Sequence, residues 1–318
     1  MAFLKGIILE AFISFQLKKI KKLEDDFFKL KHTYKASDLS LPRFNKIFST
    51  PILFDDGGES FSINISSLLF LNSFFKDIRK SVEFPNINLN APTKADDGFF
   101  NQLENYKKYM GINYLGYTQV DSQFVFKNMA IPHKNALVLL LKLDNNEQGS
   151  ESIHESNFTI LQAYKDLWKK TLKLSEFIRT NGYSAYPGHP FLGAVSYTSL
   201  AKSAGLGWIG KNRLLIKPEF GSRLILSAVY TSIDNLPKPL ENKYNWIEDY
   251  CESCNLCTKH CPIGALMLKG FFKTISGAPK GFDRERCYQR YQRCYSYSSQ
   301  NYGYGFLMCV EKCPFNNK

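Results

Sequence analysis

Apolar side chains recur at three- and four-residue steps in several parts of the chain, which predicts amphipathic helices. This spacing over residues 3–20 predicts an N-terminal helix with a broad apolar face. It also predicts helices over residues 96–111 and 158–183. The last of these ends at Asn181 and Gly182, a pair typical of a helix C-cap.

Other segments have the pattern of strands. Residues 136–143 (ALVLLLKL) form a continuous apolar run between polar turns, which indicates a buried strand. Strands are also predicted over residues 112–120, 213–217 and 223–232, with a turn over 218–221 joining the last two. The alternation of helices and strands predicts a mixed α/β region, and residues 237–246 form a credible linker after it.

Composition fits a soluble globular protein. The chain has 318 residues, of which 44% are hydrophobic and 22% charged, enough for one large domain or two ordinary ones. The formal net charge of +12 is compatible with an anionic partner such as nucleic acid, a phosphorylated cofactor or an acidic redox protein. A Lys-rich, solvated surface explains the same charge.

The N-terminal apolar run does not have the features of a targeting segment. Lys5 and Glu10 interrupt it, and no stretch of the chain reaches about 18 uncharged apolar residues. We therefore expect a cytoplasmic protein without a transmembrane segment, whose N-terminal helix packs on the body. The alternative is contact with a membrane surface through Lys18, Lys19, Lys21 and Lys22.

All eight cysteines lie after residue 250. Clustered thiols in an intracellular protein more often bind metal than form disulfides. The first four follow the pattern C-x-x-C-x-x-C-x-x-x-C-P, by which bacterial ferredoxins bind 4Fe–4S clusters. In that pattern three cysteines bind one cluster, and the fourth, before proline, binds a neighbouring cluster.

A second set of four cysteines supplies the neighbour, and we predict two 4Fe–4S clusters with crossed ligands. One cluster is assigned to Cys251, Cys254, Cys257 and Cys313, and the other to Cys261, Cys287, Cys294 and Cys309. Zinc is the alternative, but it favours paired C-x-x-C motifs and leaves the two C-x-x-x-C-P motifs unexplained.

The second cysteine set is less regular than the first. Phe306 stands three residues before Cys309, where a cysteine would be expected, so the ligands of the second cluster are the weaker assignment. Residues 286–306 also interleave tyrosine with arginine, a composition that suits stacking on single-stranded nucleic acid. Shielding of a cluster from water is the interpretation that we favour.

The loop GLGWIGKN, residues 205–212, matches both the dinucleotide fingerprint and, in part, the phosphate-binding loop. Both motifs must follow a strand and open a helix. Here a predicted helix over 199–204 precedes the loop and a predicted strand follows it. Asn212 also replaces the Ser or Thr that holds magnesium in a phosphate-binding loop. Both nucleotide interpretations therefore fail.

Residues 201–231, followed by CESCNLCTKHCPIGAL at 251–266, resemble the epoxyqueuosine reductase family and its relatives, the reductive dehalogenases. The resemblance covers residues 175–318 well and 100–174 in outline. It implies an α+β protein with an N-terminal α/β, nitroreductase-like corrinoid-binding domain over 1–240. A ferredoxin-like domain with two 4Fe–4S clusters would follow over 241–318.

The resemblance also implies a cobalamin cofactor, whose cobalt receives electrons from the clusters. The residues matching the segment that lines the corrinoid are Gly205, Gly207, Trp208, Gly210, Lys211 and Asn212. Glycines there would let the backbone approach the macrocycle, and Lys211 could meet a corrinoid amide or a phosphate. The alternative is that the loop only turns the chain and Trp208 fills the core.

One departure concerns the proton donor. Epoxyqueuosine reductases carry an acidic residue about fourteen positions before the first glycine of this loop, where this chain has Phe191. No Asp or Glu occurs in residues 189–205. Reductive dehalogenases use a tyrosine, and the candidate donors here are Tyr197, Tyr186 and His189, with Tyr183 nearby.

The resulting hypothesis is an iron–sulfur, cobalamin-dependent reductase acting on a tRNA-borne or small-molecule substrate. Its electrons would come from an external donor such as ferredoxin or flavodoxin. One alternative is a ferredoxin-like electron-transfer protein without a working corrinoid site. The other is a cytoplasmic enzyme that resembles reductive dehalogenases.

Overall fold

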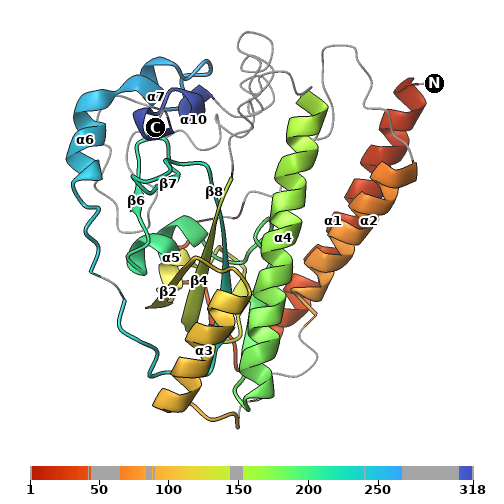
Figure 1. Ribbon diagram of the computed structural model, residues 1–318. Helices are drawn as coiled ribbons and strands as arrows, with labels where there is room; N and C mark the ends of the chain where they lie inside the picture. Colours follow the sequence, from red (N-terminus) through yellow and green to blue (C-terminus); the bar gives the residue numbers. More distant parts are fainter. Residues whose placement is uncertain are drawn as a thin grey trace.

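The computed structural model describes residues 2–41, 43, 65–83, 88, 90–143, 153–239, 241–266 and 308–316. A four-stranded sheet in the order β2-β4-β8-β5 lies at its centre (Figure 1). The strands are β2 (Tyr114–Gln119), β4 (Asn135–Lys142), β5 (Ala185–Gly188) and β8 (Leu224–Thr231). Every neighbouring pair in this sheet is antiparallel.

Helices cover both faces of the sheet, which explains the uninterrupted apolar run of β4. Leu137 and Leu139 belong to the core formed with α3 (Asp97–Tyr109) and α4 (Ile153–Thr180). The alternate residues of β4 belong to the core formed with α5 (Tyr197–Ser203). Since successive side chains of a strand point to opposite faces, a strand covered on both faces is apolar at almost every position.

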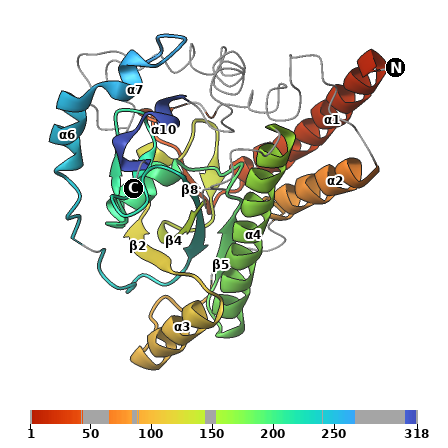
Figure 2. The same cartoon turned by 45° about the horizontal axis from the view of Figure 1, so that its top comes forward.

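The two N-terminal helices lie side by side next to α4 (Figure 2). They are α1 (Ala2–Lys29) and α2 (Ile65–Lys80), and their contact includes Phe12 and Phe75, whose ring centroids are 6.1 Å apart. The apolar face predicted for residues 3–20 therefore packs on the protein in its described part, where Ile13 and Ile20 are buried. No helix among the described residues has the length and apolar content to cross a bilayer.

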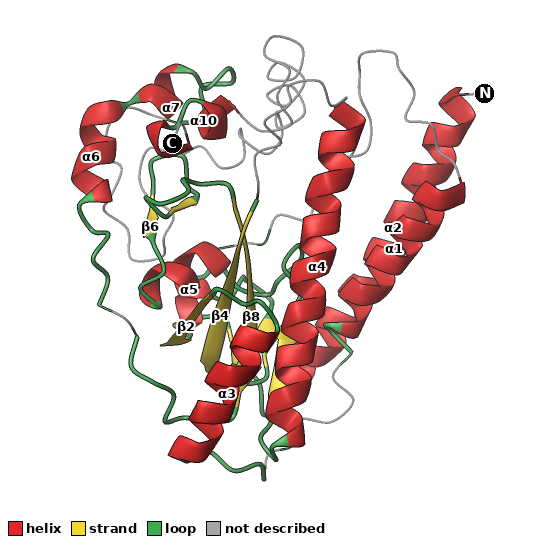
Figure 3. Ribbon diagram, in the orientation of Figure 1, coloured by secondary structure: helices red, strands yellow, loops and turns green. Residues whose placement is uncertain are grey.

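Short elements gather at the other end of the molecule, near the C-terminus (Figure 3). The hairpin of β6 (Trp208–Ile209) and β7 (Leu215–Ile216) lies there. So do the C-terminal elements, α6 (Ile247–Cys254), α7 (Leu256–Lys259), α10 (Met308–Glu311) and η3 (Pro314–Asn316). The remaining pieces are β1 (Tyr34–Lys35), which pairs with β3 (Ala130–Ile131), and η2 (Ser122–Phe124).

The elements predicted upstream of the cysteines are confirmed, and the mixture of helix and sheet with them. Gly182 adopts φ +89°, as expected of a glycine that ends a helix. The strand predicted over 213–217 is shorter, because it is confined to Leu215–Ile216 in a small hairpin. The division into domains at residue 240 stays a prediction.

Candidate functional site

Four cysteines line one cavity at the C-terminal end of the molecule. They are Cys251 and Cys254 on α6, Cys257 on α7, and Cys313, which follows α10. The cavity encloses about 290 Å³ of space not filled by protein atoms, part of it open to solvent. Cys261 and Cys309 do not line it. This grouping coincides with the crossed set predicted for the first cluster.

A left-handed residue brings the first three cysteines around the cavity. Asn255 has φ +53°, ends α6 and begins α7, so the chain changes direction between Cys254 and Cys257. Asparagine is one of the few residues other than glycine that adopt this conformation readily. The local sequence C-x-x-C-N-x-C therefore contains both the three thiols and the asparagine at which the chain changes direction between them.

The donors of this cavity are thiols from four cysteines. Within the described ranges, no three His, Cys, Asp or Glu side chains converge on one metal-ion position. A cubic 4Fe–4S cluster binds its four thiolates at separate corners, so its ligands do not meet at one point.

Burial favours the protonated thiol at Cys251, Cys257 and Cys313 by raising the pKa of each. It raises the pKa of Cys257 to about 11 and that of Cys313 to about 12, and mutual repulsion with the other cysteines adds to both increases. Burial also raises the pKa of Cys251, although the backbone N–H of Lys211 partly offsets it by a hydrogen bond to the sulfur. Metal ligation needs the thiolate, so iron binding would release protons here.

The glycine loop closes α5 in a Schellman-type turn. Gly205 has φ +72° and its N–H donates to the Lys202 carbonyl at 3.1 Å, while the Leu206 N–H donates to the Ala201 carbonyl at 2.9 Å. β6 follows directly. The order helix, loop, strand confirms the polarity that excludes a dinucleotide or phosphate loop.

Two later glycines of the loop make room for β7. A Cβ on Gly207 would lie 2.6 Å from the Ile216 carbonyl oxygen, and one on Gly210 would lie 2.3 Å from Ile216 Cδ1. Real Cβ atoms do not approach this closely. The side of each glycine on which a Cβ would stand therefore faces Ile216 of β7.

The last two residues of the loop reach the cysteines. Lys211 and Asn212 both line the cysteine cavity. Lys211 Nζ donates to Asn255 Oδ1 at 2.5 Å, and Asn212 Nδ2 donates to the Cys309 carbonyl at 3.3 Å. Trp208 lies beneath the ammonium of Lys202, 3.6 Å from its ring centroid. The corrinoid contacts expected of Gly205, Gly207, Trp208, Gly210, Lys211 and Asn212 stay a prediction.

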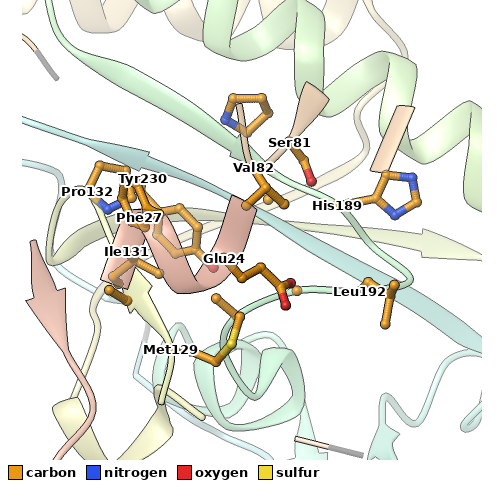
Figure 4. A pocket seen from close by; sticks show the side chains of 15 residues that line it. Glu24, Phe27, Ser81, Val82, Met129, Ile131, Pro132, His189, Leu192 and Tyr230 are labelled. Atoms are coloured by element: carbon orange, nitrogen blue, oxygen red, sulfur yellow. The ribbon is translucent and has the colours of Figure 1, made fainter. Parts of the chain in front are cut away.

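A second hollow lies between α1 and the sheet (Figure 4). It encloses about 410 Å³, partly open to solvent, and its lining includes Glu24 from α1, His189 and Tyr230. The Tyr230 hydroxyl is buried, and it interacts with the side chain of Tyr197. Glu24 accepts two hydrogen bonds from Arg43, one of them at 2.5 Å. This hollow lies next to the segment that carries the candidate proton donors.

His189 is neutral in this setting. It is 1% exposed, and burial lowers its pKa to about 3. Its Nδ1 accepts the backbone N–H of Phe191 at 3.2 Å, so the ring proton lies on Nε2. Nε2 is buried and has no hydrogen-bond partner among the described residues. His189 can therefore donate a hydrogen bond, but it does not carry the spare proton of an imidazolium near neutral pH.

The candidate tyrosines occupy different positions. The Tyr197 hydroxyl donates to the His189 carbonyl at 3.2 Å, and burial raises its pKa. Tyr186 lies on β5, directly opposite Tyr230 on β8. Tyr183 packs against Phe99, with ring centroids 4.8 Å apart. Tyr197, Tyr186 and His189 stay candidates as proton donors.

Sequence reasoning did not find Glu24, Arg43 or Tyr230. Glu24 and Arg43 precede the candidate donors by more than a hundred positions, and a lone ion pair leaves no motif. Tyr230 reads only as part of an apolar strand. Cys287, Cys294 and residues 286–306 lie outside the described residues, so the ligands predicted there for the second cluster stay a prediction.

Comparison with known proteins gives a family match at the cysteine motif and two groups of similar reductases. A 4Fe–4S binding domain matches residues 244–267. The tetrachloroethene reductive dehalogenase of Sulfurospirillum multivorans is 29% identical over 160 residues, covering 47% of this chain and 28% of that protein. The epoxyqueuosine reductase of Listeria monocytogenes is 34% identical over 129 residues, covering 39% of this chain and 30% of that protein. The chain resembles both groups of reductases.

A solved reductive dehalogenase structure shows the shared fold. Its description refers to B12-dependent dehalogenation, and it matches with a TM-score of 0.53 and 19% sequence identity. The match covers 68% of this chain and 32% of the dehalogenase. The chain thus spans less than a third of the length of each of these three relatives.

Phe191, at the position where the resemblance to epoxyqueuosine reductases predicts an acid, is part of an aromatic cluster. Its ring centroid lies 5.4 Å from that of Phe74 on α2 and 5.1 Å from that of Tyr164 on α4, both nearly perpendicular. Such edge-to-face contacts suit apolar packing. Phe191 thus joins its loop to α2 and α4. A carboxylate at this position would be partly buried among aromatic rings, which is unfavourable for a charged group.

Proposed function

We propose that this protein is an iron–sulfur reductase in which Cys251, Cys254, Cys257 and Cys313 hold one 4Fe–4S cluster. The observation that carries the proposal is the shared cavity, which Cys313 reaches from a distant part of the sequence. The match of residues 244–267 to a 4Fe–4S binding domain supports it. Crossed ligation by a remote cysteine before proline is the arrangement of two-cluster ferredoxins.

The second cluster is assigned to Cys261, Cys287, Cys294 and Cys309. Cys261 follows α7 and Cys309 lies on α10, and these two helices are in contact. Asn212 holds the Cys309 carbonyl, and the Cys261 sulfur accepts the Ala265 N–H at 3.3 Å. Both cysteines thus have fixed backbones next to the first cavity, which supports a neighbouring cluster.

The clusters would supply one-electron transfer. The protein would bury the sulfur ligands, exclude water and place cationic groups beside them. Trp246, Tyr250 and Phe315 form an aromatic cluster beside the cysteines, with Tyr250 and Phe315 centroids 5.0 Å apart. These rings would limit the approach of water. An external donor such as ferredoxin or flavodoxin would provide the electrons.

Cobalamin enters the proposal through the relatives, because a solved protein of this fold is described as B12-dependent. The six loop residues assigned to it fit the group less well. Gly207 and Gly210 pack on β7, and Lys211 and Asn212 face the cysteines. These residues do not form a corrinoid cradle in this arrangement.

The substrate class follows the two groups of relatives, a tRNA-borne base or a small molecule. The net charge of +12 suits tRNA, whereas the replacement of the family acid by Phe191 favours different chemistry. A second candidate function is electron transfer to a partner enzyme without a corrinoid. The orientation of Lys211 and Asn212 toward the cysteines favours that candidate.

Anaerobic purification with iron and sulfide assays tests the central proposal. Two 4Fe–4S clusters require about eight iron atoms per chain, and zinc without sulfide would contradict the proposal. Titration with cobalamin, followed by visible spectroscopy, then separates the alternatives. Binding followed by turnover of epoxyqueuosine-containing tRNA would support the reductase. Absence of binding would support the electron-transfer protein.

A further inference from the structure

Lys211 is a buried cation at the edge of the cysteine cavity. Its side chain lines the cavity together with the four cysteines, and the residue is only 2% exposed. The Lys211 charge interacts with Cys251 and Cys257, and its backbone N–H donates to the Cys251 sulfur. One residue thus contributes both a full positive charge and a hydrogen bond to the same ligand set.

Asn255 fixes where this charge lies. Its Oδ1 accepts a hydrogen bond from Lys211 Nζ at 2.5 Å, and its own left-handed backbone forms the turn between Cys254 and Cys257. The turn that orients the thiols therefore also orients the ammonium. A lysine at the protein surface would move freely in water, whereas this one is held beside the cavity.

We propose that Lys211 raises the reduction potential of the cluster held by Cys251, Cys254, Cys257 and Cys313. The inference rests on the proposed iron–sulfur function, and it gives the end of the glycine loop a role at the cluster. Lys211 is a positioning and electrostatic residue here, since it acts on the cluster through its charge and through the Cys251 sulfur.

The direction follows from charge. Four thiolates make the cluster anionic, and reduction adds one more negative charge. A cation held nearby with little intervening water stabilises the reduced form more than the oxidised form. Hydrogen bonds to ligand sulfurs act in the same direction. At an effective dielectric constant of about 20, loss of one charge within roughly 10 Å changes the reduction equilibrium by about tenfold, or about 59 mV.

The test compares Lys211→Met with two controls in the full-length, iron-loaded chain. Lys211→Arg keeps the charge. Lys202→Met removes a charge of the same sign close by, but Lys202 lies over Trp208 and does not line the cavity. Iron and sulfide are assayed first. The midpoint potentials of both clusters are then measured by reductive titration with dithionite, monitored by EPR.

Lys211→Met is expected to lower the midpoint potential of one cluster by about 59 mV, a tenfold change in its reduction equilibrium, with full iron loading. Lys211→Arg and Lys202→Met are expected to leave it near the wild-type value. Wild-type potentials in an iron-loaded Lys211→Met protein would overturn the inference. Absence of iron from the wild-type chain would instead overturn the proposed function, so the two failures are distinguishable.

Asn255→Asp provides a second route if Lys211→Met does not load iron. Aspartate tolerates the left-handed backbone and places a carboxylate against the ammonium, so Lys211 stays while its charge is compensated. The same decrease in potential is expected. An unchanged potential in the loaded Asn255→Asp protein would overturn the inference. Loss of iron from both variants would also overturn it, because Lys211 would then serve cluster assembly.

Discussion

Arg223, which directly precedes β8, donates a hydrogen bond from Nη2 to Oε2 of Glu311 on α10, at 2.8 Å. The two side chains are 13% and 4% exposed. The neighbouring Ser222 donates its N–H to Asn316 Oδ1 at 2.7 Å, and its Oγ accepts from Asn316 Nδ2 at 3.0 Å. These contacts join the segment that leads into β8 to α10, which carries Cys309, and to η3, which follows Cys313.

Replacement of Arg223 by Met is expected to destabilise the protein by about 3–5 kcal/mol, because it leaves the Glu311 carboxylate buried without its cation. Anaerobic urea unfolding measures the change. The double variant Arg223→Met with Glu311→Leu is expected to recover most of the loss, since neither charge then remains buried. A single-variant effect below about 1 kcal/mol would show that the pair contributes little to stability.

Cys313→Ser is expected to remove the same cluster as Cys251→Ser. Both residues line one cavity, so each variant should keep about four of the eight irons that two clusters require. Cys261→Ser is expected to affect the other cluster. EPR spectra of the reduced variants identify which signal is lost. Different missing signals in the Cys313 and Cys251 variants would contradict the crossed assignment.

Gly207→Ala is expected to destabilise the protein by about 1–3 kcal/mol, because the new methyl would collide with the Ile216 carbonyl. Thermal unfolding measures the loss. Gly98→Ala is the matched control. Gly98 is exposed in the first turn of α3, and its nearest neighbour would be the Asp96 carboxylate at 3.3 Å. Alanine is a better helix former than glycine, so this variant should be neutral or slightly more stable. Equal losses in both variants would remove the explanation by contact with β7.

Stability is expected to decrease as the pH falls below about 6.5. Burial lowers the pKa of His189 to about 3 and that of His133 to about 4. Between pH 6.5 and 4 the unfolded chain therefore takes up protons at these positions while the folded chain does not. Each histidine contributes up to about 1.4 kcal/mol per pH unit to this loss. Above pH 6.5 neither contributes.

His189→Phe tests the larger of the two contributions. Its ring packs at 5.4 Å from Phe74 and 5.1 Å from Trp168, so another aromatic ring suits the site. The free energy of unfolding, measured in urea from pH 7 to pH 4, should fall less steeply with decreasing pH in the variant. Identical slopes would mean that His189 gains a proton in the folded state at ordinary pH.

The sequence predicts much of this fold because its strongest patterns are local. The apolar run of β4 is confirmed because that strand is buried over most of its length, and the helical spacing of α4 is confirmed because one face of its described part is buried. The thiol spacing is also a local pattern, and the four cysteines that it assigns to the first cluster line one cavity. That they bind a cluster stays a prediction.

Other features depend on contacts between remote segments and left no pattern. Nothing near Lys211 in the sequence indicates that its ammonium meets Asn255 rather than a cofactor phosphate. Likewise, Phe191 reads as a missing acid in sequence, and only its contact with Phe74 explains the aromatic ring. Glu24 lines the second hollow because α1 packs on α2 and β3, and helix packing cannot be deduced from a single amphipathic pattern.

The position of Cys313 has a thermodynamic consequence. A cluster bound to Cys257 and Cys313 would cross-link the two ends of residues 257–313, and such a closure removes conformational entropy from the unfolded chain. Iron would then be a folding ligand for this part of the protein, since an unfolded chain cannot hold four thiolates at the corners of one cube. The native C-terminal part would therefore last longer when iron is plentiful. It would last for a shorter time when oxygen destroys the cluster.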